Sequence, residues 1–154
     1  MRASDLAEPY PLVGTDDDAM EAARLFAEHQ LPALLVVDRD GHPYAIVPGS
    51  QLLRVIVPEY VLREPSLTPS LRDGDDERLS DVLEGLTVAE WLRGQGQRAL
   101  PTVVGVSVSA IEIAELMVRT HTPLVAVVES DGDRTRTVGA IRAARLMEYF
   151  IHRS

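Results

Sequence analysis

One sequence pattern occurs twice in this chain, and it constrains the fold more than any other feature. Residues 18–38 (DAMEAARLFAEHQLPALLVVD) align without a gap on residues 109–129 (SAIEIAELMVRTHTPLVAVVE) at a constant offset of 91 positions. Asp18 and Ser109 are good helix N-cap residues, and a glutamate stands three positions after each, where its carboxylate can reach back to the cap amide. The repeat therefore predicts two equivalent structural units that each begin a helix at the same place.

Around these stretches the chain predicts the same order of elements twice: strand, helix, strand, strand, helix. In the first copy we expect a short helix near Ala3–Ala7, strands at Tyr10–Val13, Leu34–Val37 and Tyr44–Val47, and a final helix at Ser50–Ile56. In the second copy we expect a short helix at Thr87–Leu92, strands at Thr102–Val108, Leu124–Val128 and Thr137–Ile141, and a final helix from about Ala143 to Phe150. Three additional residues in the second hairpin raise the offset from 91 to 94, which a loop tolerates at little cost.

The segment between the copies, residues 57–85, is long for a connection inside a compact domain. Its turn-rich part, Pro65 to Asp75, predicts a loop, and the apolar spacing from Asp76 to Leu86 predicts a helix. The predicted organisation is therefore a first motif at residues 1–56, a linker with its own helix, and a second motif at residues 86–154.

Composition narrows the function classes. The chain has no cysteine, which excludes disulfides, thiolate zinc sites and cysteine nucleophiles. Its net charge of −9 is uneven: residues 1–58 hold nine acids and four arginines (−5), residues 59–90 nine acids and three arginines (−6), and residues 91–154 six acids and eight arginines (+2). Such an acidic surface argues against nucleic-acid binding. Only the C-terminal third suits a small anion.

The apolar runs are of strand length, and the N-terminal MRASDLAEPY has no apolar region typical of a secretory signal. We therefore expect a soluble, cytoplasmic protein that does not insert into a membrane.

Several features together point to a known family: the paired unit order, the alanine-rich helix after a capped start, the apolar runs that end in an acid (Leu34–Asp38 and Leu124–Glu129), and the glycine turn before a short strand and final helix. In these features the chain resembles the CBS (cystathionine β-synthase) domain family. The resemblance implies an α/β (α+β) fold in which two βαββα motifs pack through their sheets about a pseudo-twofold axis, joined by the linker, as in a Bateman module.

The resemblance also implies a function. Bateman modules commonly bind adenine nucleotides such as AMP, ADP or ATP between the motifs, often pair as homodimers, and recur in association with membrane transporters. We therefore expect a regulatory protein that senses an adenine nucleotide or another anionic small ligand and modulates a transporter or an enzyme. The alternative is a ligand-free module for dimerisation or docking with degenerate nucleotide sites.

In nucleotide-binding members of the family, the last strand ends in a small residue, two apolar residues, a Thr or Ser, two variable residues and an Asp. The hydroxyl meets phosphate at a helix N-terminus, and the carboxylate accepts from ribose. The chain reads AIVPGSQ at residues 45–51 and GAIRAAR at residues 139–145. Both copies lack the hydroxyl residue and the acid, which argues against the usual mode of adenosine recognition.

The residues that replace them are the candidate ligand-binding residues. Arg142 and Arg145 stand near a helix start, where guanidinium groups can add to the backbone amides in binding phosphate. The alternative is that both are solvated and that Arg145 pairs with Glu148 or Glu129. Gln51 is a candidate for ribose binding, although a polar residue early in an exposed helix needs no ligand. Asp16 and Ser107 complete the candidate set; for Asp16, a helix start enriched in acids is the simpler explanation.

No catalytic pattern is visible, and we expect neither an enzyme nor a metal site. The four histidines stand isolated, without an HExxH or paired spacing, and no GxSxG elbow occurs. We expect a homodimer instead, because one copy leaves apolar helix faces to cover. The faces that the sequence suggests for this contact are Leu25/Phe26, Leu116/Met117 and Leu146/Tyr149/Phe150.

Overall fold

The computed structural model describes residues 1–72, 77–94 and 101–154. The helices are α1 (Ala3–Leu6), α2 (Ala19–Glu28), α3 (Gly49–Arg54), α4 (Glu59–Arg63), α5 (Arg78–Leu83), α6 (Val88–Gly94), α7 (Ala110–Thr120), α8 (Ala143–Arg153) and the 3₁₀ helix η1 (Pro65–Ser70). The strands are β1 (Leu12–Gly14), β2 (Ala33–Val37), β3 (Pro43–Pro48), β4 (Val103–Gly105), β5 (Leu124–Asp131) and β6 (Arg134–Arg142).

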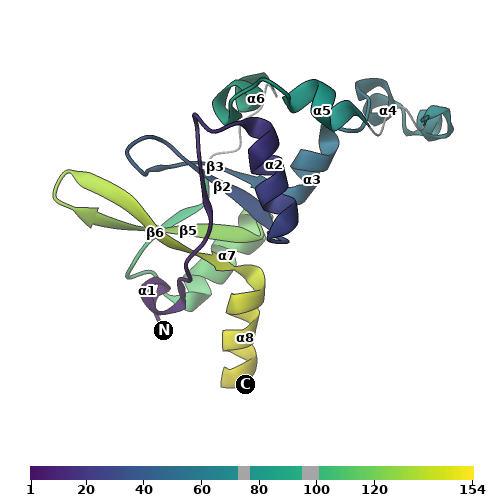
Figure 1. The fold of residues 1–154 in the computed structure, drawn as a ribbon. Coiled ribbons are helices and arrows are strands. Elements are labelled where there is room, and N and C mark those ends of the chain that lie inside the picture. The colour runs from purple at the N-terminus through teal and green to yellow at the C-terminus, as the bar shows by residue number, and fades with distance from the viewer. Residues whose placement is uncertain (73–76, 95–100) are drawn as a thin grey trace.

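Each half of the chain contributes one three-stranded sheet, ordered β1-β2-β3 and β4-β5-β6 (Figure 1). In each sheet the first strand runs parallel to the central strand, and the third runs antiparallel to it. The registers are equivalent: Gly14 pairs with Val37 in the first sheet, and Gly105 pairs with Val128 in the second. A bulge in the antiparallel pairing occurs immediately before Val37 and again immediately before Val128. The predicted fold of two βαββα motifs with equivalent central strands is confirmed.

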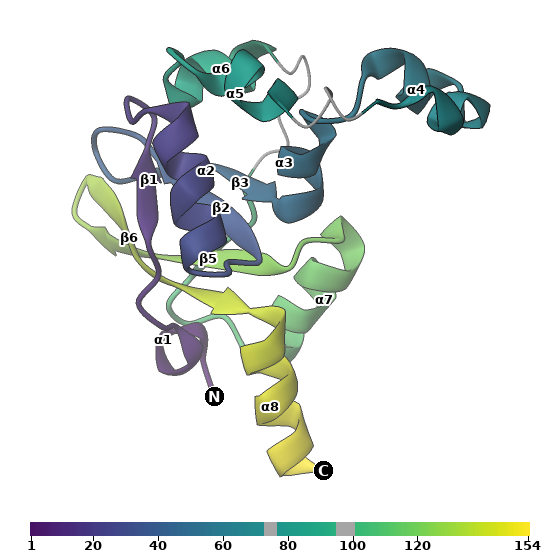
Figure 2. The ribbon, with the colours of Figure 1, turned by 45° about the vertical axis from the view of Figure 1, so that its right-hand side comes forward.

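The two sheets lie between two groups of helices, as Figure 2 shows. The side chains of the central strand β2 alternate between its two faces, and both faces are buried. Leu34 and Val36 join a cluster with α2, α3, α5 and α6, and Ala33 and Leu35 face the second sheet. A separate cluster lies between the second sheet and α1, α7 and α8. The side chains between the sheets are apolar, and three of the six buried ones are alanines, which lets the two motifs approach closely.

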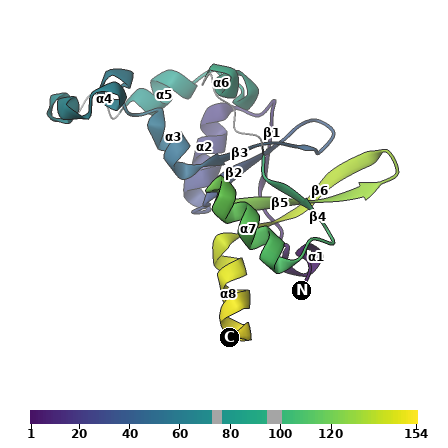
Figure 3. The ribbon, with the colours of Figure 1, turned by 180° about the vertical axis from the view of Figure 1, so that it is seen from behind.

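The two short helices that precede the motifs are exchanged between them. α1 precedes the first motif in sequence, but its Ala3 and Leu6 belong to the core of the second motif. The N–H of Ala3 donates to the carbonyl of Val108 at 2.8 Å, and the N–H of Val88 in α6 donates in the same way to Asp17 at 2.8 Å. The segment between α1 and β1 therefore crosses from one half of the molecule to the other (Figure 3).

The predicted N-caps are present, but their glutamates are used differently. Asp18 and Ser109 accept from the N–H groups of Glu21 and Glu112, as the repeat predicts. The predicted return contact from each glutamate to the cap amide is wrong. The Glu21 carboxylate pairs with Arg24, and the Glu112 carboxylate accepts from the Ser109 hydroxyl at 2.9 Å.

Several predicted elements differ in the structure. The hairpin strands expected at Leu124–Val128 and Thr137–Ile141 are longer, since β5 extends to Asp131 and β6 begins at Arg134. The strand expected at Thr102–Val108 is only β4, because the chain turns after Gly105 so that the carbonyls of Val106 and Val108 can accept from α1. The loop expected from Pro65 begins with η1, and its residues 73–76 lie outside the described residues.

α4 and η1 form an arm, residues 57–72, that projects from the two sheets (Figures 1 and 3). α4 and η1 pack against each other, and Val61 is buried there. Across residues 1–72, 77–94 and 101–154, no helix has both the length and the apolar character needed to cross a bilayer.

Candidate functional site

The start of α8 carries two of the candidate arginines. Arg142 ends β6 and is the N-cap residue of α8, and Arg145 lies in the first helical turn. Within the described part of the chain, no side chain caps this helix start, in contrast to the starts of α2 and α7. The N–H of Ala143 donates to the carbonyl of Pro123 at 3.1 Å. The amides that follow Ala143 in the first turn, together with Arg142 and Arg145, are therefore the groups that favour an anion at this helix start.

Each of these arginines already has a carboxylate partner. Nη2 of Arg142 lies 3.2 Å from Oε1 of Glu8, and the two side chains are 47% and 41% exposed. Nη1 of Arg145 lies 3.9 Å from Oε1 of Glu148. Of the two partners considered for Arg145, Glu148 is the one in contact, since Glu129 pairs with Arg136 at 3.4 Å. The ion pairs are partly exposed, so water and solute anions can reach them.

Glu8 is placed by the segment that connects α1 with β1. Its backbone N–H and C=O both bond to Ala140 of β6, each at 3.0 Å. This close approach requires a glycine at position 139, because a Cβ there would lie 2.7 Å from the carbonyl oxygen of Glu8. The backbone of Glu8 is therefore clamped to β6, beside Arg142.

Tyr10 follows two positions later and lines the same region. Its hydroxyl donates to the carbonyl of Ala33 at 2.5 Å. Burial raises the pKa of the Tyr10 hydroxyl, and the hydrogen bond to Ala33 and then the positive charge of Arg142 partly oppose that rise. Tyr10 therefore remains neutral at physiological pH and adds no charge to the arginine site.

The equivalent helix start in the first motif offers no cation. Pro48 stands in the place of Arg142, and Gln51, which is half-buried, stands in the place of Arg145. The ring of Phe26 lies against the start of α3, since a Cβ added at Gly49 would be 2.8 Å from its Cζ atom. Gln51 is thus placed at a helix start, as predicted, but with an aromatic ring beside it in place of a charge.

Asp16 and Ser107 lie at the other end of the sheets. They follow β1 and β4, and these strands run away from the end where α3 and α8 begin. Asp16 accepts from Nε of Arg39 at 2.6 Å. Ser107 lines a surface hollow of about 520 Å³ together with the carboxylates of Glu112 and Glu129, which is the wrong charge for an anion. Arg142 and Arg145 thus share one helix start, each paired with its own carboxylate, whereas Asp16 and Ser107 lie at the other end of the sheets.

His42, which the sequence predicted to be isolated, contacts Asp38. Its Nδ1 lies 3.4 Å from Oδ2 of Asp38, because the hairpin turn brings residues four apart together. Burial disfavours the Asp38 carboxylate, but backbone N–H bonds from His42 and Asp40 outweigh that effect and hold the pKa of Asp38 below its usual value. These contacts are those of a tight turn.

Glu8 and Tyr10 are the site residues that sequence reasoning missed. Glu8 and Arg142 stand 134 positions apart, and no local pattern links them. The one available signal was Gly139, which replaces the equivalent Ala45 of the first copy and marks a close backbone approach.

Comparisons with known proteins identify the family of the fold. A sequence model of the CBS domain matches residues 3–58, which contain the first motif. A comparison with curated proteins finds no match.

Solved structures match the whole chain. A CBS domain-containing protein of unknown function from Kribbella flavida DSM 17836 is 38% identical over 98% of this chain and 99% of that chain, with a TM-score of 0.78. The CBS domain of a CBS domain-containing membrane protein from Sphaerobacter thermophilus is 25% identical over 96% and 86% of the two chains, with a TM-score of 0.65. CBSX2 in complex with AMP is 16% identical over 98% and 96%, with a TM-score of 0.65, and at that identity it shows the fold alone. With the two equivalent motifs, their stacked sheets and a 38% identical relative along its length, this chain belongs to the CBS-domain family.

Proposed function

We propose that this chain is a regulatory CBS-domain protein that senses a phosphate-bearing small ligand, such as AMP, ADP or ATP, at the start of α8. The observation that carries the proposal is the pair of guanidinium groups, Arg142 and Arg145, at a helix start that no side chain of the described residues caps. Guanidinium groups and helix amides together bind phosphate oxygens by charge-assisted hydrogen bonds.

The two motifs differ in their suitability for an anion. The C-terminal segment, residues 91–154, has a net charge of +2, from eight arginines and six acids, whereas residues 1–58 have −5. At the start of α3, Pro48 offers no donor and Phe26 lies against the helix. We therefore propose that the second motif holds the operating site and that the first binds no anion.

The crystal structure of CBSX2 with AMP supports an adenine nucleotide as the ligand, because that protein shares this fold. Arg145, however, occupies the position of the family's ribose-binding acid. A ribose hydroxyl would lose an acceptor there, at a cost of about 1–3 kcal/mol if buried. Affinity should therefore follow the charge of the phosphate groups more than the identity of the base.

The test is calorimetric titration with AMP, ADP, ATP and inorganic phosphate. We expect binding that strengthens with phosphate charge and weakens roughly ten-fold or more in Arg142→Ala/Arg145→Ala, since each charge-assisted bond contributes about 1.5–3 kcal/mol. The matched control is Arg134→Ala/Arg136→Ala, which removes the same charge from the opposite end of β6. Adenine-selective binding that survives the Arg142/Arg145 change would contradict the proposal.

We further propose that the site regulates a partner protein in the cytoplasm and that the chain itself is not catalytic. A membrane transporter or an enzyme is the proposed partner. A similar sequence from Sphaerobacter thermophilus is the CBS domain of a membrane protein, which supports a membrane partner.

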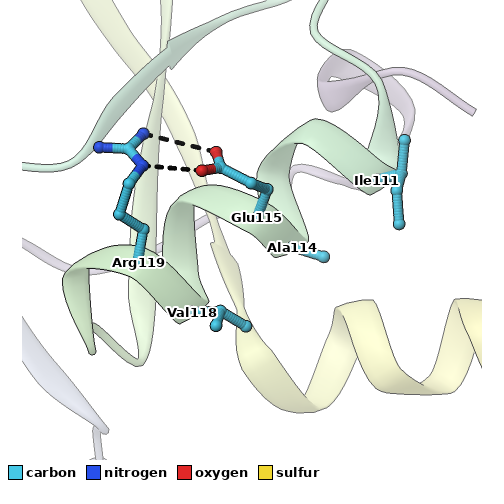
Figure 4. A pocket seen from close by; sticks show the side chains of 5 residues that line it. All are labelled: Ile111, Ala114, Glu115, Val118 and Arg119. Atoms are coloured by element: carbon cyan, nitrogen blue, oxygen red, sulfur yellow. Dashed lines mark hydrogen bonds and ion pairs between the residues drawn. The ribbon is translucent and has the colours of Figure 1, made fainter.

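The alternative is a ligand-free dimerisation or docking module, and an exposed apolar surface favours it. On neighbouring α7 and α8, Ile111, Val118, Met147 and Ile151 are all exposed, Val118 to 73%. Figure 4 shows Ile111, Ala114 and Val118 along α7, where they line a shallow hollow of about 360 Å³ beside the Glu115–Arg119 ion pair. If no phosphate compound binds, this surface carries the function.

We propose that this surface forms a homodimer. The residues that the sequence suggested for such a contact were partly wrong, because Met117 and Leu146 are buried in the core of their own chain. The exposed stripe lies one position further along each helix, at Val118 and Met147.

A further inference from the structure

We propose that Glu8 is a specificity-determining residue of the anion site: its carboxylate occupies the Arg142 guanidinium, so a ligand must displace Glu8 in order to bind there. This inference rests on the proposed function at the start of α8, and it explains which anions that site selects. The observation behind it is the contact of 3.2 Å between Nη2 of Arg142 and Oε1 of Glu8.

The backbone of Glu8 is fixed, and its side chain is free to move. Two backbone hydrogen bonds of 3.0 Å to Ala140, and the absence of a side chain at Gly139, hold the segment against β6. The Glu8 side chain extends from this clamp to Arg142 and is 41% exposed. A rotation of that side chain towards solvent therefore frees the guanidinium without disturbing the pairing with β6.

The Glu8 carboxylate is a weak occupant. Hydrogen bonds between an arginine and a carboxylate are typically about 2.7–2.9 Å long, and the observed bond of 3.2 Å is longer. An ion pair this exposed contributes only about 0.2–1 kcal/mol. A phosphate dianion has more charge and a third oxygen, so it can bridge Arg142 and the amides of Ala144 and Arg145 in the first turn of α8, while the Ala143 amide donates to Pro123. A monocarboxylate offers nothing that Glu8 does not already provide.

Arg145 is arranged in the same way. Glu148, one turn along α8, lies 3.9 Å from it, too far for a short hydrogen bond. Both arginines are thus paired with carboxylates of the chain itself. We therefore expect discrimination against small carboxylates and in favour of phosphate dianions.

The test compares wild type with Glu8→Gln, which removes the competing charge and keeps the side-chain size. The probe is inorganic phosphate, and the measurement is an NMR titration that follows the Arg142 Nε signal and the amides of Ala144 and Arg145. We expect phosphate to bind roughly two- to five-fold more tightly to Glu8→Gln, which is the fold-change that corresponds to an exposed ion pair. Acetate should shift these signals in Glu8→Gln more than in wild type.

Two controls make the test specific. Glu59→Gln removes the same charge from the arm and should leave phosphate affinity unchanged. In an Arg142→Ala background, Glu8→Gln should give no gain, because the competition acts through Arg142. Melting temperatures of all variants establish that the fold is kept.

Each result decides the proposal. A gain that disappears in the Arg142→Ala background supports it. If wild type binds phosphate and Glu8→Gln binds it equally well, Glu8 is not a competitor, and the proposed anion site stands without it. A gain that persists without Arg142 overturns the mechanism. If neither wild type nor Glu8→Gln binds phosphate, both this inference and the proposed function fail.

Discussion

At the scale of single residues, the arrangement of the site depends on Gly139. The carbonyl oxygen of Glu8 occupies the space that a side chain at this position would need. The equivalent residue of the first motif is Ala45, so the two motifs differ here although their strand registers agree. Because Gly139 lacks a methyl group, the N-terminal segment can pair with β6, and Glu8 then lies next to Arg142.

Gly139→Ala should destabilise the protein by about 1–3 kcal/mol, because the new Cβ would overlap backbone atoms that cannot rotate away. Urea unfolding measures the change. Gly105→Ala is the matched control: its Cβ would meet no atom within 4 Å, so we expect a change within about 0.5 kcal/mol. Equal stability of the two variants would show that the segment around Glu8 is free to shift.

At the scale of elements, α6 shows how a short helix is held in the other half of the molecule. Thr87 and Glu90 form a reciprocal capping box, in which each side chain accepts from the backbone N–H of the other, both at 3.1 Å. The N–H of Val88 then docks α6 onto the turn before α2. A helix of this length is marginal alone, so the cap and the docking together stabilise it.

The stability that Glu90 provides should depend on pH. The N–H of Thr87, and then its hydroxyl, hold the pKa of the Glu90 carboxylate below its ordinary value of 4.5. Because the pKa is lower in the folded state, this stabilisation is complete well above 4.5 and is lost as the pH falls through the lowered value.

Glu90→Gln should therefore unfold at a lower urea concentration than wild type at pH 7, and the difference should shrink as the pH falls below about 4.5. Urea titrations between pH 7 and pH 3 measure this. Glu84→Gln removes the same charge from outside the box and serves as the control. A difference between Glu90→Gln and wild type that is constant with pH would count against the role of the carboxylate.

At the scale of the whole molecule, helices pack in an order that differs from their order in the sequence. We propose that residues 1–56, 57–85 and 86–154 are a first motif, a linker and a second motif as units of sequence. In space, α1 completes the core of the second motif, and α5 and α6 complete that of the first. The helices on the outside of the second motif expose Val118 and Met147, which is where we place the homodimer contact.

Light scattering at micromolar concentration should give a dimer mass for wild type. Val118→Glu/Met147→Glu should give a monomer with an unchanged circular dichroism spectrum, because both side chains are exposed, to 73% and 61%. Leu67→Glu places one charge on an exposed apolar residue of the arm and should leave the dimer intact. A monomeric wild type would exclude this homodimer.

The sequence by itself determined the two equivalent motifs, because their signals are local. The N-caps at Asp18 and Ser109 and the apolar runs of the central strands depend on hydrogen bonds and side-chain alternation among near neighbours. The position of Arg142 and Arg145 at a helix start was also predictable, since they follow the last strand of the second copy in the alignment of the two copies. Only the tertiary structure decided that α1 and α6 exchange partners and that Glu8 meets Arg142 from 134 positions away. Such contacts join residues that are far apart in sequence, and they form only where both partners leave room, as Gly139 does for the backbone of Glu8.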